Sequence, residues 1–384
     1  MIIPDYKNKK TRYLVLLINF VGAIFFFWIR KKKIDSDLIR KILIVKLDRI
    51  GDTFLATPTV EATRRQFPSA KIIFLAAPWN KEVLENNPNI DELVIFEKAL
   101  NVHRAGFFSI INHLKKAKQL AKVIKEISPD IVIDLEGHPL NVLAMFKARV
   151  PIRVGFGDKV LSFLLTNKTK KDKSIHQSDI YFRIAKILGY KSERPEEKIF
   201  IGGKEKEEIN KFMENNNLKN FIVIHLGAGR NYRQWPLNNF IDLANLIMKN
   251  YPELKLIIIG GNEDRKLAEQ FINGIQNKDR VISVIGKLNI PETYQLLSFA
   301  KLFIGSESAP MHLAGAQNIP TIAFMSQWSG IERWKPLGEK VYVFKSKNIH
   351  KCPGIKCKLI PCPNMAAISV SEVYNFIKDK ELFK

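Results

Sequence analysis

Residues 41–66 read KILIVKLDRIGDTFLATPTVEATRRQ, and they contain the unit from which the fold is repeated. The first six residues form a short aliphatic run that is typical of a buried strand. A loop with Gly51 follows, and residues 57–66 have the pattern of a helix. A strand followed by a turn and a helix is the repeating unit of a parallel α/β sheet.

The same alternation occurs on both sides of a polar segment. Before that segment we predict strands over residues 41–46, 71–76, 92–96 and 131–135, and after it over residues 221–225, 255–259, 281–285, 301–304 and 320–324. The segment itself, residues 191–204, contains Pro195 and the pair Gly202-Gly203, which is typical of a hinge. We therefore predict two doubly wound, Rossmann-like α/β domains with ligands beyond the carboxyl ends of their strands.

The predicted organisation has four parts. Residues 1–40 form a membrane-associating helix and linker, 41–200 and 201–350 the two domains, and 351–384 a cysteine-containing loop with a helix. A chain of 384 residues suits two domains of about 150 residues each. The final helix, predicted over residues 371–380, could pack back on the first domain.

The charge of the chain favours anionic partners. There are 61 Lys+Arg against 38 Asp+Glu, a net charge of +23. Such a field attracts phosphorylated substrates and acidic lipid headgroups, although a lysine-rich composition alone would also produce it. Basic residues do not interleave with aromatic ones as in a base-stacking sheet, so a nucleic-acid partner is not expected.

The N-terminal region predicts contact with a membrane. Residues 13–29 are an apolar run whose one strongly polar member is Asn19. Basic residues flank this run: Lys7, Lys9, Lys10, Arg12, Arg30, Lys31, Lys32 and Lys33. Its length is short for a spanning helix, which needs about 20 apolar residues, so we favour an in-plane anchor. A true span and a docking helix buried on the protein remain alternatives.

Asp52 is the candidate general base. It follows the first strand in the loop of residues 47–53, LDRIGDT, where Gly51 permits a tight turn. A carboxylate at this position could take the proton from an attacking hydroxyl. The alternative is that Asp52 or Thr53 only caps the next helix.

A second loop, residues 225–236, has the features of a phosphate site. It contains two glycines that allow close backbone approach, Gly227 and Gly229, and two arginines, Arg230 and Arg233. Guanidinium forks suit phosphate oxygens, and the helix that follows would point its free amides at the same place. The alternative is a glycine-rich connection with surface arginines.

The third loop, residues 305–312, reads GSESAPMH and joins a strand to a helix. Glu307 could accept two hydroxyl hydrogen bonds from a ribose or another sugar, while Ser306 or Ser308 caps the helix. His312 lies one turn into that helix and is either a donor-binding residue or a structural histidine.

Together these elements resemble glycosyltransferase family 9, the heptosyltransferase family. The resemblance rests on KILIVKLDRIGD followed by TP, on the loop that ends in WP, and on GSESAPMHL, in that order between Lys41 and Val343. It implies a GT-B fold with the acceptor-binding domain first and the nucleotide-sugar domain second. It also implies inverting transfer that requires neither a cofactor nor a metal.

The resemblance carries roles to individual residues. Asp52 takes the position of the base, with Arg49 and Gly51 beside the acceptor, and Arg233 that of the donor-phosphate residue, where Lys is usual. Glu263 takes the position of a nucleoside contact. The expected donor-binding set is Gly227, Gly229, Arg230, Arg233, Glu263, Ser306, Glu307, Ser308 and His312. Glu307 stands where the family has an aspartate, which leaves the nucleotide and the sugar open.

The implied reaction moves heptose from ADP-heptose to a lipid-linked glycan such as growing lipopolysaccharide, at the cytoplasmic face of the inner membrane. Two alternatives remain: the same fold with another nucleotide sugar, and a non-catalytic membrane-bound protein that binds nucleotides or polyanions.

The cysteines lie close together near the C-terminus. His350, Cys352, Cys357 and Cys362 could form a zinc site, but their spacing is looser than in structural zinc pairs. We therefore expect free thiols and no metal. Three cysteines also cannot complete a disulfide framework, which agrees with a reducing compartment.

Overall fold

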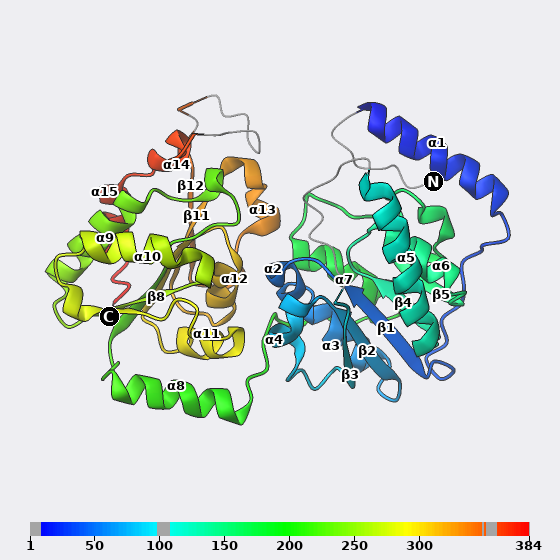
Figure 1. The fold of residues 1–384 in the computed structure, drawn as a ribbon, viewed down its shortest axis with the longest axis horizontal. Coiled ribbons are helices and arrows are strands. Elements are labelled where there is room, and N and C mark those ends of the chain that lie inside the picture. Colours follow the sequence, from blue (N-terminus) through cyan, green and yellow to red (C-terminus); the bar gives the residue numbers. More distant parts are fainter. Residues whose placement is uncertain (1–8, 98–107, 348, 351–358, 384) are drawn as a thin grey trace. The chain divides into compact units, whose positions relative to one another are not determined.

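The structure is a computed structural model that describes residues 9–97, 108–347, 349–350 and 359–383 (Figure 1). The chain divides into two compact units, Met1–Phe200 and Ile201–Lys384. Each unit is built around one parallel sheet, so each is described by itself.

In the described part of unit 1, six parallel strands form a sheet with the order β3-β2-β1-β4-β5-β6. The strands are β1 (Lys41–Lys46), β2 (Lys71–Ala76), β3 (Glu92–Ile95), β4 (Ile131–Asp134), β5 (Ile152–Phe156) and β6 (Asn167–Thr169). The helices are α1 (Lys9–Phe25), α2 (Ile50–Phe54), α3 (Thr57–Gln66), α4 (Lys81–Leu84), α5 (Phe108–Ile127), α6 (Pro139–Lys147) and α7 (Gln177–Ile187).

Strand β1 determines which face of this sheet meets which helices. Leu43 and Val45 are fully buried in a core that includes Leu120 and Ile124 of α5 and Met145 of α6. Because side chains alternate along a strand, Lys46 lies on the opposite face, where Tyr181 of α7 contacts it. The last residue of a buried strand thus presents an ammonium group to the α7 face.

Unit 2 repeats the topology, and its described part also has six parallel strands, in the order β12-β11-β10-β7-β8-β9. They are β7 (Phe221–His225), β8 (Lys255–Ile259), β9 (Val281–Ser283), β10 (Leu302–Ser306), β11 (Thr321–Met325) and β12 (Val341–Lys345). The helices are α8 (Gly203–Asn215), α9 (Leu237–Asn250), α10 (Arg265–Gly274), α11 (Ile290–Leu297), α12 (Ala309–Ala316), α13 (Ile331–Trp334), α14 (Pro363–Ala366) and α15 (Val370–Asp379).

Trp235 fixes the start of α9 against the sheet of unit 2. Its side chain is fully buried and stacks on Phe324 of β11 with ring centroids 4.1 Å apart. Its backbone N–H donates to Oγ of Ser306 at 2.9 Å, and its indole N–H donates to the carbonyl oxygen of Ile368 at 3.0 Å. One side chain therefore ties the second candidate loop to β10, β11 and the C-terminal segment.

The C-terminal helix belongs to unit 2. Val373 and Ile377 of α15 are fully buried in the same core as Phe240 and Leu243 of α9. A return to the first domain, which the sequence left open, does not occur. The reason is that the apolar face of α15 completes the core beside α9.

Helix α1 packs on unit 1. Asn19 donates a hydrogen bond from Nδ2 to the carbonyl oxygen of Lys159 at 3.0 Å. Gly22 lies so close to the ring of Phe163 that a Cβ there would collide with it. Phe26 makes ring contacts with Phe146 and Phe163. Within the described residues, no helix is long and apolar enough to cross a membrane.

The sequence located most of the described strands accurately and missed three of them. β1, β2, β7 and β8 have the predicted bounds, and other predicted strands shift by one or two residues. β5, β6 and β12 were not predicted. β6 and β12 are edge strands with partly exposed, polar residues, whereas β5 is a buried inner strand whose apolar run is interrupted by Arg153 and Gly155.

Replacing Ile377 by Ala tests whether α15 is part of the core of unit 2. We expect Ile377→Ala to lower the free energy of unfolding by about 2–5 kcal/mol, because a fully buried side chain leaves a cavity. The measurement is urea unfolding followed by circular dichroism. Asn375→Ala, on the exposed side of the same helix, is the control and should change little. Equal stability of the two variants would place α15 outside the core.

Candidate functional site

Polar residues gather where the strand order of each sheet reverses. In unit 1 the reversal lies between β1 and β4, and in unit 2 between β7 and β10. Loops leave neighbouring strands there in opposite directions, which opens a crevice at the carboxyl ends of the strands. The first candidate loop follows β1, the second follows β7 and the third follows β10. Both units thus place their candidate residues at the position where such sheets bind ligands.

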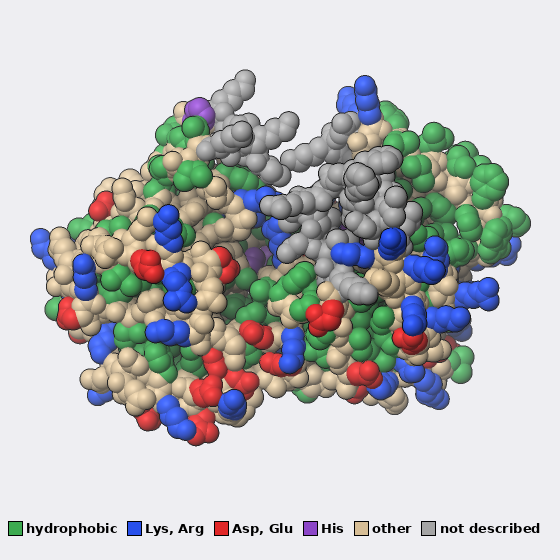
Figure 2. Space-filling view, in the orientation of Figure 1, with side chains coloured by type: hydrophobic (Ala, Val, Ile, Leu, Met, Phe, Trp, Pro, Cys, Tyr) green, Lys and Arg blue, Asp and Glu red, His purple; other side chains and the backbone are tan. Residues whose placement is uncertain are grey.

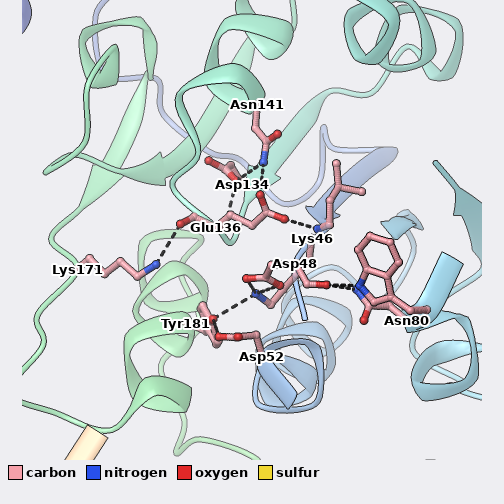
Figure 3. A network of polar contacts seen from close by, with 11 residues as sticks. Lys46, Asp48, Asp52, Asn80, Asp134, Glu136, Asn141, Lys171 and Tyr181 are labelled. Carbon is pink, nitrogen blue, oxygen red and sulfur yellow. Dashed lines mark hydrogen bonds and ion pairs between the residues drawn. The ribbon is translucent and has the colours of Figure 1, made fainter. Parts of the chain in front are cut away.

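In unit 1 the centre of the site is the buried ammonium group of Lys46 (Figure 3). Its Nζ lies 2.7 and 2.8 Å from the two carboxylate oxygens of Asp48 and 3.2 Å from the hydroxyl oxygen of Tyr181. The carbonyl oxygen of Asp48 in turn accepts from Nε1 of Trp79 at 2.6 Å and Nδ2 of Asn80 at 3.0 Å. The loop after β1 is therefore held from three sides.

Asp52 is held by Tyr181 and does not cap its helix. The hydroxyl of Tyr181 donates to Oδ1 of Asp52 at 2.9 Å (Figure 3). The N-cap position of α2 is Arg49, which makes no side-chain cap hydrogen bond. Thr53 is buried, and its hydroxyl makes no hydrogen bond to the described residues. The capping alternative for Asp52 and Thr53 is therefore wrong.

Two more acids reach the site from the end of β4 and from the loop after it. Asn141 donates from Nδ2 to Oδ1 of Asp134 and to Oε2 of Glu136, at 3.0 Å in each case. Glu136 also accepts from the backbone N–H of Leu47, and its carbonyl oxygen accepts from Nζ of Lys171 at 3.0 Å. The loops after β1 and β4 are thus joined by side chains at the reversal point.

Burial in this cluster changes proton affinities. It raises the pKa of Asp134 to about 6, against the opposing hydrogen bond from Asn141. Although 33% of the Asp48 side chain is exposed, burial of its carboxylate group among the other acids raises its pKa to about 7, against the charge of Lys46. Burial, followed by the charge of Asp134, raises the pKa of Glu136. Burial lowers the pKa of Lys46, but the nearby carboxylates outweigh it and hold that pKa above its usual value.

These shifts make part of the stability of unit 1 dependent on pH. The folded chain binds the protons of Asp134 and Asp48 more tightly than the unfolded chain does. Their contribution to stability is therefore complete below about pH 4, the ordinary range of an aspartic acid. It is lost as the pH rises through about 6 for Asp134 and about 7 for Asp48.

Sequence reasoning did not single out Lys46, Asp134, Glu136, Lys171 or Tyr181. A signal was present for the two acids, because IVIDLEG places Asp134 near the end of a predicted strand and Glu136 directly after it. Nothing in the sequence shows that Lys46 turns inward at the end of β1. Tyr181 lies 129 positions from Asp52, so only the fold brings the two together.

In unit 2 the predicted residues Arg233 and Glu307 form an ion pair. Nη1 of Arg233 lies 2.9 Å from Oε1 of Glu307, and their side chains are 22% and 6% exposed. Burial raises the pKa of Glu307, and the charge of Arg233 opposes that rise. Nε of Arg233 is buried and makes no hydrogen bond to the described residues. One nitrogen of the guanidinium group is thus left without a hydrogen-bond partner among the described residues.

A second set of contacts joins the carboxyl ends of β7, β8 and β10. Oγ of Ser308 lies 3.0 Å from Nδ1 of His225, and Nε2 of His225 lies 3.3 Å from Oδ2 of Asp264. Ser308 takes the N-cap position of α12 without a side-chain cap, because its hydroxyl donates to the carbonyl oxygen of Ser306. The predicted capping of α12 by Ser306 or Ser308 is therefore wrong; Ser306 instead accepts from the N–H of Trp235.

The other predicted donor residues lie around these contacts. A Cβ on Gly227 would collide with the carboxylate of Asp264, so a larger residue there would have to displace that side chain. Gly229 and Glu263 are exposed, Arg230 is half-buried, and His312 is buried in α12. The structure brings these residues to one edge of the sheet, and their roles toward a donor stay predictions.

The cysteine region offers no metal site within the described residues. His350 is described, but Cys352 and Cys357 lie outside them, and Cys362 is a buried free thiol in the core of unit 2. Across the described part of the chain, no group of three or more His, Cys, Asp or Glu side chains is arranged to hold a metal ion.

Comparison with known proteins identifies the family. The sequence profile described as glycosyltransferase family 9 (heptosyltransferase) matches residues 117–361. Lipopolysaccharide heptosyltransferase 3 of Escherichia coli K12 is 23% identical, over 79% of this chain and 87% of that protein.

Solved structures share the fold. The crystal structure of the family 9 glycosyltransferase from Veillonella parvula has a TM-score of 0.76 at 22% identity, covering 92% of this chain and 99% of that one. An E. coli heptosyltransferase solved with ADP has a TM-score of 0.64 at 17% identity, covering 88% and 99%, and was also solved with ADP-2-deoxy-2-fluoro heptose. The two switch-point sites thus lie on a GT-B fold, and the chain belongs to glycosyltransferase family 9.

Proposed function

We propose that this glycosyltransferase moves heptose from ADP-heptose to a lipid-linked core oligosaccharide such as lipopolysaccharide. The observation that carries the proposal is the position of the Asp52 carboxylate at the switch point of unit 1. This carboxylate does not cap α2, and it accepts a hydrogen bond from Tyr181. Support for the donor comes from the related E. coli heptosyltransferase, which was solved with ADP and with a fluorinated ADP-heptose. Identity of about 23% supports the class of reaction more strongly than the choice of sugar.

The proposed step is a single displacement with inversion. Asp52 takes the proton of the acceptor hydroxyl, whose oxygen forms a bond to the anomeric carbon of the donor. The bond from that carbon to the phosphate oxygen breaks, and ADP leaves with the electron pair. Asp48 is less suited to this role, because both of its carboxylate oxygens already accept from Lys46.

Unit 2 is the proposed donor-binding unit. Arg233 would place its guanidinium on the diphosphate and stabilise the charge that grows there as the bond breaks. No metal is required by this scheme, because Arg233, Arg230 and backbone amides supply the compensating positive charge. Glu307 shares Arg233 with the diphosphate and is the proposed contact to donor hydroxyls.

Two other functions remain distinguishable by experiment. The first is the same reaction class with another nucleotide sugar, which the replacement of the family's aspartate by Glu307 would favour. The second is a membrane-bound protein that binds nucleotides without turnover. Formation of a glycosylated product would exclude the non-catalytic binding protein. The nucleotide that binds most tightly would distinguish ADP-heptose from another nucleotide-sugar donor.

Asp52→Asn tests the base. We expect the variant to fold and to bind ADP while its turnover falls by about 10²–10⁴-fold, because an amide cannot accept the proton. The assay measures ADP release from ADP-heptose, with lipopolysaccharide from cells that lack this gene as acceptor. Glu126→Gln, which changes an exposed acid on α5, is the matched control and should keep full turnover. Turnover of Asp52→Asn equal to that of the control would mean that another residue is the base.

Arg233→Ala tests the donor site. We expect this variant to weaken the binding of ADP and pyrophosphate by roughly 1.5–3 kcal/mol, the scale of a hydrogen bond to a charged group. Glu307→Gln should not weaken the binding of pyrophosphate, because the substitution removes the negative charge that competes for Arg233. Calorimetric titration with ADP, UDP, GDP and pyrophosphate gives both results.

Lys249→Ala, an exposed change at the end of α9, is the control for these titrations. If Arg233→Ala binds ADP and pyrophosphate as well as the wild type does, the diphosphate does not bind at this loop. Tighter binding of UDP or GDP than of ADP to the wild type would favour another donor.

Helix α1 is the proposed membrane anchor. Val15, Asn19 and Gly22 face unit 1, whereas the opposite side exposes large apolar residues. This exposed stripe consists of Tyr13, Leu14, Leu17, Ile18, Phe20, Val21, Ile24 and Phe25. Figure 2 shows hydrophobic side chains gathered over α1, with basic side chains at its first turn.

An in-plane position fits this helix best. Its inner side is already used by unit 1, while Phe27 and Trp28 are exposed directly before the basic cluster of residues 30–33. Apolar side chains next to lysines suit the headgroup boundary of an anionic bilayer. We propose that the protein works at the cytoplasmic face of the inner membrane, held there by α1.

A double substitution in the stripe tests the anchor. We expect Leu17→Glu with Ile24→Glu to abolish sedimentation with phosphatidylglycerol vesicles, because two carboxylates cannot enter the bilayer boundary. Tm should stay unchanged, since both positions face away from unit 1. Leu38→Glu, which is exposed outside α1, is the control. Full vesicle binding by the double variant would exclude α1 as the anchor.

A further inference from the structure

The donor and the acceptor of each hydrogen bond leading to Asp52 follow from the chemistry of the side chains. The ammonium group of Lys46 can only donate, so the hydroxyl oxygen of Tyr181 accepts in the 3.2 Å contact between them. Tyr181 has one hydroxyl proton, and that proton is donated to Oδ1 of Asp52 at 2.9 Å. Lys46, Tyr181 and Asp52 therefore form a one-way chain of hydrogen bonds that ends on the carboxylate.

The chain is built into the unit rather than formed at its surface. Lys46 is fully buried and Tyr181 is 1% exposed, while Asp52 is half-buried. Lys46 is held in turn by Asp48, and its Nζ lies 4.3 Å from the centre of the Tyr181 ring. Two enclosed side chains from β1 and α7 thus meet a partly accessible acid on α2.

We propose that Tyr181 and Lys46 are positioning residues for Asp52. This inference rests on the proposed role of Asp52 as the base. Among the described residues, the Asp52 carboxylate hydrogen-bonds through Oδ1, which leaves Oδ2 to receive the proton of the acceptor hydroxyl. A hydrogen bond to the ionised form keeps a carboxylate ionised to lower pH. The chain therefore orients the Asp52 carboxylate and selects Oδ2 as the reacting oxygen.

Other charged side chains surround the Asp52 carboxylate. Asp48 on the same loop, Asp134 at the end of β4 and Glu136 after it are acids that disfavour a further negative charge. Lys46 from β1 and Lys171 from the loop before α7 oppose them, and Nζ of Lys171 lies 6.0 Å from the centre of the Tyr181 ring. Among these neighbours, the Tyr181 hydroxyl is the group that donates a hydrogen bond to the Asp52 carboxylate.

Tyr181→Phe tests the proposal, because it removes the hydroxyl and keeps the ring against Lys46. We expect kcat to fall about 10- to 100-fold, the range for losing a hydrogen bond to a charged group. We also expect the acidic limb of the kcat–pH profile to move to higher pH, while KM for ADP-heptose stays unchanged. The assay is ADP release between pH 5 and 9 with the acceptor described above.

Tyr190→Phe is the matched control. Tyr190 is another buried tyrosine of unit 1, and its hydroxyl lies 3.5 Å from Nη1 of Arg65, outside the cluster. It should leave both kcat and the pH profile unchanged. A fall in kcat for Tyr181→Phe that is equal at every pH would mean a structural role and would overturn the proposal.

A double variant separates this proposal from the role of Asp52. If Tyr181 acts through Asp52, then Tyr181→Phe adds no further loss in the Asp52→Asn background. Independent, multiplicative losses would overturn the inference while leaving Asp52 as the base. Normal turnover in Asp52→Asn alone would instead reject the proposed base, and this inference with it.

Discussion

The buried ammonium group of Lys46 is the constraint on which the site of unit 1 depends. A fully buried charge is tolerated when opposite charges and hydrogen bonds compensate it. Asp48 supplies the charge, and Tyr181 supplies a further acceptor. Once these partners are in place, the loop after β1 has little freedom, and Asp52 is carried to the hydroxyl of Tyr181. The same compensation lets four acids share one edge of the sheet.

Unit 2 has the same strand order but a different balance of charge. Its anchor is apolar, since Trp235 is buried against Phe324 and hydrogen-bonds to Ser306. Around this anchor the polar groups are an Arg233–Glu307 ion pair and a His225–Asp264 contact. One topology thus carries an acid-rich cluster in unit 1 and a mixed, partly compensated cluster in unit 2. That difference agrees with a proton acceptor in one unit and a diphosphate in the other.

The sequence predicted the inner framework well, because continuous apolar runs such as KILIVK and KLIII have few alternatives to a buried parallel strand. It failed where the signal is weak or distant. β6 is three residues long and contains Asn167 and Lys168, so it has no strand pattern. The serines at the start of α12 matched a capping pattern, but their hydroxyls bond to Trp235 and to a carbonyl oxygen instead. Local patterns give candidates for a hydrogen bond, and the surrounding fold selects the partner.

The sequence by itself determined the fold class and the family and indicated the candidate loops, because apolar periodicity and short motifs are local properties of the chain. Only the tertiary structure decided which side chains meet. Lys46 and Tyr181 are 135 positions apart, and Arg233 and Glu307 lie on different strand–helix loops. Such pairs form because a doubly wound sheet returns its loops to one edge. Charge compensation under burial then fixes their partners, and that depends on neighbours in space rather than in sequence.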